Sequence, residues 1–473
     1  MPAALHPAPV VDRPAHRDPN VLRWLGAYSA SAIGDNIYYV ALSWAAVQAG
    51  TPAQAGLVTA AGAVPRAVLM LGGGVVADRY GPRRVVLVSS AGRCLLVVVA
   101  AGLLLATSPG LWALGAVAVL FGVVDAVFLP AAGALPARIT GPGQLARVQG
   151  MRGLATRLAT VLGGPLAGLG IALGGTSGAF GSAALLIGVS LPVLWAVRVR
   201  PLPPDGRRAR GGGLADGRRL RDGGWARSPA LRGAARAHRC LPGGTSQALG
   251  HWGRHACARL AEAVPRRRRV RDGVLGELRD GVRHIRRDRV LRPLVLAIAL
   301  GDLGFVGPMN LGLTLLSEER GWGSSGMGWV LGGFGIGAGA ASLLLMVRGR
   351  VPRAALVSAV AEIAGCVAIT GLAHAASVVA AACVALFIGL LSGLGGALRG
   401  ALLQLRAGPA YVGRVISAST LVSFGVAPLT YPVVGWAIEA WGTAPVFAAC
   451  AAICALGGVV TLSAGPLRRA ELP

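Results

Sequence analysis

The hydrophobic residues of this chain are gathered into long runs that short polar segments interrupt. A helix needs about 20 apolar residues to cross the hydrocarbon core of a bilayer, which is about 30 Å thick. Runs of that length with few charges therefore predict membrane-spanning helices. The pattern predicts twelve of them, at residues 22–46, 53–77, 83–106, 110–134, 150–173, 178–199, 292–316, 325–347, 354–376, 378–402, 413–437 and 443–465. Six precede a long polar segment and six follow it.

Arginine is unevenly distributed between the connections of these predicted spans. One alternating set of connections, together with both terminal segments, is rich in arginine, whereas the other set holds only Arg320. Basic residues stay on the cytoplasmic side of a membrane, so we expect both termini on that side. Residues 1–20 contain no apolar stretch of the kind that a cleavable signal peptide needs, and the first span is therefore expected to be retained.

The two groups of spans resemble each other in sequence. Gly34-Asp35 recurs as Gly301-Asp302 and Arg147-Val148 as Arg414-Val415, at an offset of 267 residues. Two six-span halves of the same orientation imply a pseudo-two-fold axis along the membrane normal, with a cleft between the halves. We expect an all-α membrane protein with two six-helix bundles of transmembrane helices. Its parts are a cytoplasmic tail 1–21, a bundle 22–199, a basic cytoplasmic linker 200–291, a bundle 292–465 and a cytoplasmic tail 466–473.

Composition agrees with lipid as the solvent for much of the surface. Of 473 residues, 54% are hydrophobic and only 14% are charged, whereas a soluble domain has about 25% charged residues. This excludes an ordinary water-soluble enzyme. No phosphate-binding Gly-x-x-x-x-Gly-Lys loop is present, so we expect neither ATP hydrolysis nor enzymatic activity. The seven cysteines lack the spacing of a disulfide framework or a zinc module, and we expect no metal and no cofactor.

The connection after the second span carries a motif that can serve a conformational switch. An Asp at the end of a helix can pair with arginine or with a helix N-terminus in one conformation only, and glycine permits the tight turn between two spans. The bland alternative is a basic loop that only orients the chain. The residues that form the motif are Gly74, Asp78, Arg79, Gly81, Arg83 and Arg84.

This connection resembles the signature loop G-x-x-x-D-R-x-G-R-R of the major facilitator superfamily. The twelve spans, the repeat and the long central segment are similar to that family too, over nearly the whole chain outside residues 204–272. The resemblance implies two rigid bundles that rock to expose a central cavity to each side of the membrane in turn. It also implies that Asp78 and the arginines brace one of the two states.

Within that family, two branches share motifs with this chain. Gly164, Pro165 and Gly168 in the fifth span resemble part of the Gly-Pro-x-x-Gly-Gly motif of drug antiporters, although Thr160 and Leu169 replace glycines of that motif. The fourth span lacks the Arg-x-x-Gln-Gly element of the same branch. Other segments more closely resemble the macrolide-efflux and siderophore-exporter branch, namely Gly34-Asp35, Val64-Pro65-Arg66, Leu129-Pro-Ala131 and Gly413-Arg414-Val415. These resemblances imply export.

Several ionisable residues lie near the middles of predicted spans, where each costs about 2.5–3.5 kcal/mol on insertion scales and needs a partner or a role. The resemblance places spans 1, 4 and 7 at the cavity, so Asp35, Asp125 and Asp302 are candidates for proton carriage or cation recognition, with Arg66 beside them. The alternative is structural pairing, of Asp35 with Arg66 or of Asp125 with Arg93.

Three other charges and several aromatic residues have weaker assignments. The resemblance puts Glu362 in a peripheral span, and Arg399 and Glu439 lie close enough to span ends for their charges to reach the interface. Mid-span aromatic side chains either stack on an aromatic substrate or simply pack in the core. They are Tyr38, Tyr39, Trp44, Phe128, Phe305 and Phe424.

The central segment supplies about half of the net charge of +27. Residues 201–290 hold 22 arginines and eight acidic residues. Near 274–289, apolar residues at helical spacing predict an amphipathic helix on anionic lipid head groups. Residues 204–272 have no apolar period and are expected to be a linker, unless a frame-shift created them. Neither nucleic-acid binding nor a metal site at Cys240, His251, His255 and Cys257 is expected.

These observations predict a monomeric secondary transporter in the plasma membrane of a bacterium. We expect proton-driven export of small amphipathic drugs or a specialised metabolite. Two alternatives remain, an uptake permease for a nutrient or siderophore and a non-transporting sensor or scaffold.

Overall fold

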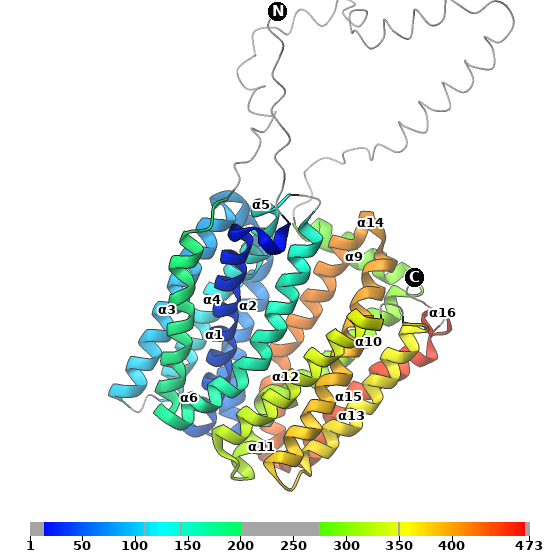
Figure 1. Cartoon of the computed structure of the whole chain (residues 1–473). Coiled ribbons are helices and arrows are strands. Elements are labelled where there is room, and N and C mark those ends of the chain that lie inside the picture. The colour runs from blue at the N-terminus through cyan, green and yellow to red at the C-terminus, as the bar shows by residue number, and fades with distance from the viewer. Residues whose placement is uncertain (1–13, 108–109, 142–143, 200–273, 349–350, 469–473) are drawn as a thin grey trace, which may run out of the picture. The chain divides into compact units, whose positions relative to one another are not determined.

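The computed structural model describes residues 14–107, 110–141, 144–199, 274–348 and 351–468, and this part of the chain consists of helices and short connections (Figure 1). The predicted linker 204–272 lies outside the described residues. The helices are η1 (Ala15–Arg17), α1 (Pro19–Ala49), α2 (Pro52–Tyr80), α3 (Pro82–Ala106), α4 (Leu111–Ala134), α5 (Pro136–Ile139), α6 (Leu145–Trp195), α9 (Val274–Arg287), α10 (Leu291–Gly307), the π-helix η5 (Pro308–Gly312), α11 (Leu313–Glu319), α12 (Gly323–Arg348), α13 (Ala354–Ala373), α14 (Val378–Trp441), α15 (Thr443–Ser463) and α16 (Gly465–Arg468).

Every predicted span falls on a helical part of the chain, and the seventh, 292–316, consists of α10, η5 and α11 in succession. Ten helical segments among the described residues are long and apolar enough to cross a membrane. One of the ten, 147–195, contains two predicted spans, and α1 is absent from the ten although it covers the first predicted span. The second of the two spans in α6 ends at Trp195, four residues before its predicted end. The polar residues of α1, which include Asp35 and Asn36, lower its mean hydropathy.

Local sequence sets the helix ends. The Asp18 side chain accepts a hydrogen bond from the backbone of Asn20 and caps α1. Thr51 and Gln54 form a capping box at the start of α2. Glycine is needed at several turns. Gly81 (φ 86°) separates α2 from α3, and Gly408 (φ 68°) breaks α14 between the tenth and eleventh predicted spans. A further break in α6, at 174–175, separates the fifth span from the sixth.

The helices form two halves, α1–α6 and α10–α15, that meet through α6 with α12 and through α2 with α14. In Figure 1, α5, α9 and α16 lie at one end of the bundle, called here the basic end, and α11 lies at the other, called the α11 end. A core of buried apolar residues drawn from both halves includes Tyr38, Phe121, Leu316 and Phe447. Towards the basic end, each half has a separate core.

The two halves touch through glycines near the α11 end. Gly168 of α6 lies so close to α12 that a Cβ atom on it would stand 3.1 Å from the Cα of Gly328. Pro165 packs on Gly332 in the same interface. Small residues allow helix backbones to approach closely in a membrane. We call these residues, together with Gly164 and Leu331, the α6–α12 contact.

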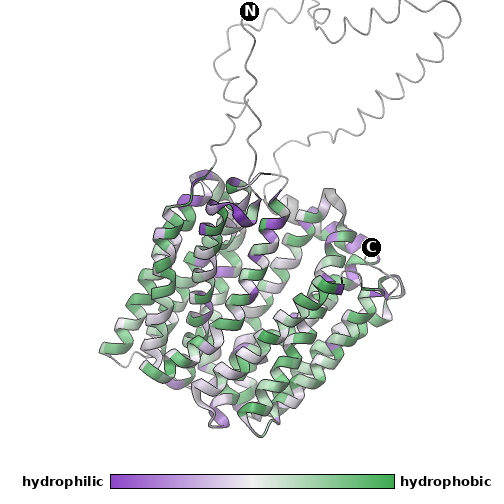
Figure 2. Ribbon diagram, viewed as in Figure 1, coloured by the Kyte–Doolittle hydropathy of each residue, from purple (hydrophilic) through white to green (hydrophobic). Residues whose placement is uncertain are grey.

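The helices consist mostly of apolar residues, as the ribbon in Figure 2 shows. Large side chains such as those of Trp112 (93% exposed), Leu173 and Val347 stand free of the protein core. A soluble monomer rarely exposes so continuous an apolar surface. The chain is a multi-pass membrane protein whose helices face lipid.

Helix α9 lies on the second half. It is formed by the segment for which the sequence predicts an amphipathic helix. Gly281 packs against the backbone of Arg414, and Asp280 forms an ion pair of 3.7 Å with the same arginine. The His284 ring stacks on Tyr411, with 4.3 Å between the ring centroids. These contacts attach α9 to the break region of α14.

Candidate functional site

A cavity of about 430 Å³ lies between the two halves. Its wall is largely apolar and includes several aromatic side chains, and its charged members are Arg66 from α2 and Asp302 from α10. Apolar walls with a few polar groups are typical of sites that bind small molecules. The aromatic side chains at this wall are Tyr38, Tyr39, Phe121, Phe305, Phe334, Phe424 and Tyr431.

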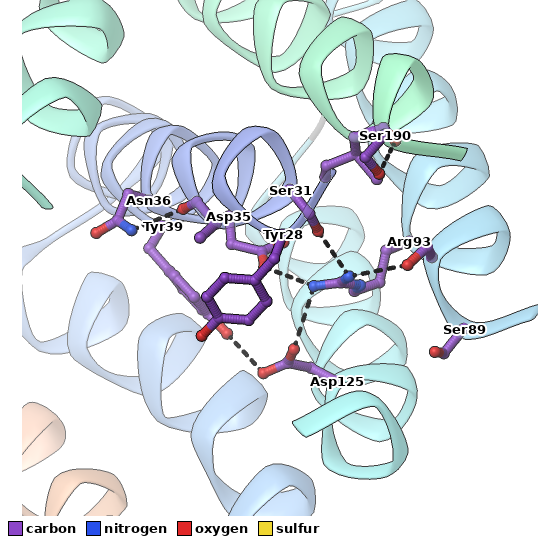
Figure 3. A network of polar contacts seen from close by, with 12 residues as sticks. Tyr28, Ser31, Asp35, Asn36, Tyr39, Ser89, Arg93, Asp125 and Ser190 are labelled. Carbon is purple, nitrogen blue, oxygen red and sulfur yellow. Dashed lines mark hydrogen bonds and ion pairs between the residues drawn. The ribbon is translucent and has the colours of Figure 1, made fainter. Parts of the chain in front are cut away.

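A network of buried charges lies beside this cavity in the first half, centred on Arg93 of α3 (Figure 3). The Arg93 side chain is completely buried. Its Nη1 lies 2.6 Å from Asp35 Oδ2 and 3.5 Å from Asp125 Oδ1. Its Nη2 donates to the hydroxyls of Ser31 and Ser90. One guanidinium thus links α1, α3 and α4 and compensates two carboxylates.

Arg66 connects this network to the cavity. Its Nε lies 3.2 Å from Asp125 Oδ2, and its Nη1 donates to the Tyr39 hydroxyl at 2.8 Å. The Tyr39 hydroxyl in turn donates to Asp125 at 3.2 Å. The guanidinium also lies 4.7 Å from the ring centroid of Phe424 on α14, which is a cation–π contact between the two halves.

The structure separates the four predicted coupling or substrate residues into two groups. Arg66 and Asp302 line the central cavity, whereas Asp35 and Asp125 are not among the residues that line it. The ion pairs differ in part from those expected. Asp35 pairs with Arg93 and has no ion pair with Arg66 within the described residues, while Asp125 contacts both arginines.

The second half has a charged cluster of its own, next to a second cavity of about 250 Å³. Glu362 of α13 pairs with Arg399 of α14, with 2.5 Å between Oε1 and Nη1. Asp302 lines both cavities and accepts a hydrogen bond from Ser423. The expectation for Arg399 was wrong, because its side chain forms an ion pair with Glu362 inside the half. Glu362 lies in α13, whose main helix contacts in the described structure are with helices of its own half, and its side chain is buried there.

The aromatic candidates fall into two groups, those that line the central cavity and those that pack elsewhere. Tyr38, Tyr39, Phe305 and Phe424 line the central cavity, whereas Trp44 is packed in the core. Phe128 lies under Arg93, with 3.5 Å from its ring centroid to the guanidinium carbon. Sequence reasoning did not single out Phe121, Phe334 and Tyr431, which line the cavity too. Phe121 lies four positions before Asp125, and this helical spacing could have found it. No polar residue lies three or four positions from Phe334 or Tyr431, so the sequence offered no such signal for them.

The signature loop forms the short turn between α2 and α3. The Gly81 N–H donates to the Ala77 carbonyl, and Arg83 Nη2 donates to the Trp195 carbonyl at 2.5 Å. A cation at the last carbonyl groups of a helix is stabilised by the helix dipole. Gly74 has open space around it, and Arg79 lies over the ring of its neighbour Tyr80. The side chain of Asp78 lies outside what the structure describes.

The partial antiporter-like motif occupies the interface between the halves. Gly164, Pro165 and Gly168 are the α6 members of the α6–α12 contact. Their small size lets α12 approach without a side chain between the backbones. Farther along the α11 end, Ala53 N–H donates to Glu439 and Gln48 donates to Glu318, so polar groups also join the halves there.

Among the residues that the structure describes, no cluster of three or more histidine, cysteine or acidic side chains could hold a metal ion. The four residues considered for a metal site in the central segment, Cys240, His251, His255 and Cys257, lie outside the described residues.

Comparison with known proteins finds a matching family and solved structures of similar fold. A family model described as Major Facilitator Superfamily matches residues 24–429. Three solved structures share the fold: the nucleoside transporter NupG (TM-score 0.63, 11% identity, 94% of this chain and 100% of that chain), a peptide transporter in complex with sulfate (0.61, 15%, 95% and 94%) and a D-xylose-proton symporter (0.62, 12%, 95% and 97%). A search of the curated proteins found no match.

Proposed function

The chain belongs to the major facilitator superfamily, and from this premise we propose that it exports small amphipathic compounds in exchange for protons. Family and fold make it a membrane transporter and not an enzyme. Direction, substrate and coupling are the proposed parts. The exchange operates by alternating access in the plasma membrane of a bacterium, with both termini and α9 in the cytoplasm.

The central cavity is the observation that carries this proposal. Aromatic side chains from both halves surround one guanidinium, on Arg66, and one carboxylate, on Asp302. Aromatic faces bind flat apolar groups and cations, and a carboxylate adds attraction for a positive charge. The cavity therefore suits an amphipathic molecule with an aromatic ring and a cationic group.

The packing of the halves supports access from one side. The halves share a core and the α6–α12 contact near the α11 end, and they have separate cores towards the basic end. The arginine-rich connections lie at the basic end, and such connections face the cytoplasm. In this orientation the cavity faces the compartment from which an exporter collects its substrate.

The uptake alternative is favoured by a different observation. One of the three similar structures is described as a proton symporter of D-xylose. The change in the internal concentration of the substrate decides between the two directions. An importer raises this concentration, whereas an exporter lowers it.

The test uses ethidium, a fluorescent aromatic cation, in bacterial cells that lack their main drug exporters. Cells that express the protein should accumulate less ethidium than cells with an empty vector, and an uncoupler of the proton gradient should abolish the difference. Higher accumulation would support uptake. Equal accumulation at confirmed membrane expression would contradict export of this class of cation.

A further inference from the structure

The charged cluster of the second half has one more carboxylate than it has arginine partners. Glu362 pairs with Arg399, and Asp302 lines the same cavity of about 250 Å³. Asp302 has no ion pair within the described part of the chain. In the first half, by contrast, two carboxylates contact two guanidiniums. A neutral network in a membrane needs no further charge, whereas a cluster with a surplus carboxylate is stabilised by a proton or a cation.

Glu362 occupies a niche that other helices leave open for its carboxylate. A Cβ atom on Gly301 of α10 would lie 2.6 Å from Glu362 Oε1, and one on Gly457 of α15 would lie 3.1 Å from it. The Cys454 thiol lies 4.0 Å from the same oxygen. Two glycines on different helices thus give the carboxylate the room that any larger side chain would fill.

The second oxygen of this carboxylate is unpaired. The Glu362 side chain is 3% exposed, and its Oε2 is buried without a hydrogen-bond partner among the described residues. A buried carboxylate oxygen without a partner is costly. Asp35 Oδ1 in the first half is unpaired as well, so the surplus carboxylate is what distinguishes the second half. Protonation at this oxygen removes the negative charge, while Oε1 keeps its contact with Arg399.

The other titratable or charged groups around this cavity do not cancel the surplus. Cys366 of α13 and Cys454 of α15 are neutral as thiols. Arg157 of α6 also lines the cavity, but its side chain is exposed and forms no ion pair with either carboxylate in the described structure. The cluster of Glu362, Asp302 and Arg399 therefore keeps one carboxylate without an ion-pair partner in the described structure.

We propose that Glu362 and Asp302, which line one cavity together with Arg399, form the site that takes up the exchanged proton. This inference rests on the proposed proton exchange and assigns it to the second half instead of Asp35 and Asp125. One proton passes from water to a carboxylate oxygen, and the cluster changes from a net charge of −1 to neutral. After the halves have rocked, the proton leaves the carboxylate and returns to water on the other side of the membrane.

The position of Asp302 links this site to the substrate. Asp302 lines both cavities, so a cationic substrate in the central cavity interacts with the same surplus negative charge that a proton neutralises in the second. Binding of either cation weakens the attraction for the other. This mutual exclusion is what an exchange of proton for cation requires.

The test measures proton binding without a substrate. Infrared difference spectra are recorded between acidic and alkaline buffer, in H₂O and D₂O, on the purified full-length protein in vesicles of phosphatidylethanolamine and phosphatidylglycerol. We expect the wild type to show the C=O band of a buried protonated carboxyl group. Glu362→Gln and Asp302→Asn should each lose it, since either change removes the surplus carboxylate. Glu319→Gln, at an exposed position of the α11 end, is the matched control and should keep the band.

Two results would overturn the assignment: a band that persists in both Glu362→Gln and Asp302→Asn, or a band that disappears in Asp125→Asn alone. Asp302→Asn leaves the pair of Glu362 with Arg399 in place, so it remains informative if Glu362→Gln does not fold. The infrared result is independent of ethidium export. An intact band with no ethidium transport therefore counts against the proposed function and not against the proton site.

Discussion

Arg66 and Asp125 form an ion pair of 3.2 Å in which only the guanidinium reaches the central cavity. Asp125 is 4% exposed on its side chain and lies behind Arg66 and Tyr39. The cavity therefore presents the positive guanidinium of Arg66, whose charge is compensated by the buried carboxylate of Asp125. The network around Arg93 then holds α1, α2, α3 and α4 in register, as the structural alternative for Asp35 and Asp125 supposes.

Removal of Arg93 should destabilise the first half strongly. Arg93→Gln leaves two buried carboxylates with only Arg66 to compensate them, and loss of one partner of a buried pair costs about 3–5 kcal/mol. The double variant Asp35→Asn/Arg93→Gln keeps the pair of Arg66 with Asp125 and should recover much of the loss. Thermal unfolding in detergent measures both. Arg157→Gln, at an exposed position, should melt like the wild type, and an equal loss in the single and double variants would contradict the network.

Phe424 should favour the arrangement in which the α11 end is closed. Its ring contacts the Arg66 guanidinium of the other half, and such contacts contribute about 0.5–1 kcal/mol at partly exposed sites. Phe424→Ala should raise accessibility of the cavity from the α11 end by about two- to fivefold. The measurement is labelling of Asn310→Cys, in a background without native cysteines, by a membrane-impermeant maleimide. Phe387→Ala, on the exposed face of α14, should not change the labelling rate.

The α6–α12 contact should not tolerate a larger residue. A side chain at Gly168 would meet the Ser324 carbonyl and the Gly328 backbone, so Gly168→Val should prevent closure at the α11 end. We expect faster labelling of Asn310→Cys and loss of ethidium export at normal expression. Gly153→Val, in the same helix but with open space around it, is the control. Unchanged labelling in Gly168→Val would show that this contact does not hold the end closed.

Replacement of residues 204–272 by a flexible Gly-Ser linker should spare transport. The contacts that position α9 on the second half come from Asp280, Gly281 and His284, all outside the deleted range. Ethidium export and thermal stability should match those of the full chain. Loss of a cellular response with intact export would instead support the scaffold alternative for the central segment.

Much of the fold follows from the sequence because hydropathy reports directly on the solvent around each segment. The two halves follow from repeated residues such as Gly34-Asp35 and Gly301-Asp302. The partner of each buried charge does not follow, since it depends on how each helix is rotated about its axis. Arg399 illustrates the difficulty: its place along the span suggested an interfacial residue, whereas rotation of α14 turns its side chain towards Glu362.

Residues that are close together in the sequence indicated their shared position in the structure more directly than the isolated charges did. Asp35 and Tyr39 are four positions apart and share a helix face, and both belong to the same network. The cavity itself depends on the distance between the halves, which no single span encodes. Asp302 was a candidate because the resemblance places the seventh span at the cavity, but its position at the boundary of two cavities depends on the packing of α10 against α14 and α15.

Glycine and proline at the α6–α12 contact have a consequence for repeated cycling. Apart from Leu331, the residues of this contact have few or no side-chain rotamers, so joining and parting the two backbones freezes and releases little conformational entropy. A contact made mainly of interlocked leucines would have to reorganise on every turnover. An interface with few interlocking side chains can part and reform with little hysteresis, which suits a transporter that must pass between two states of similar free energy many times.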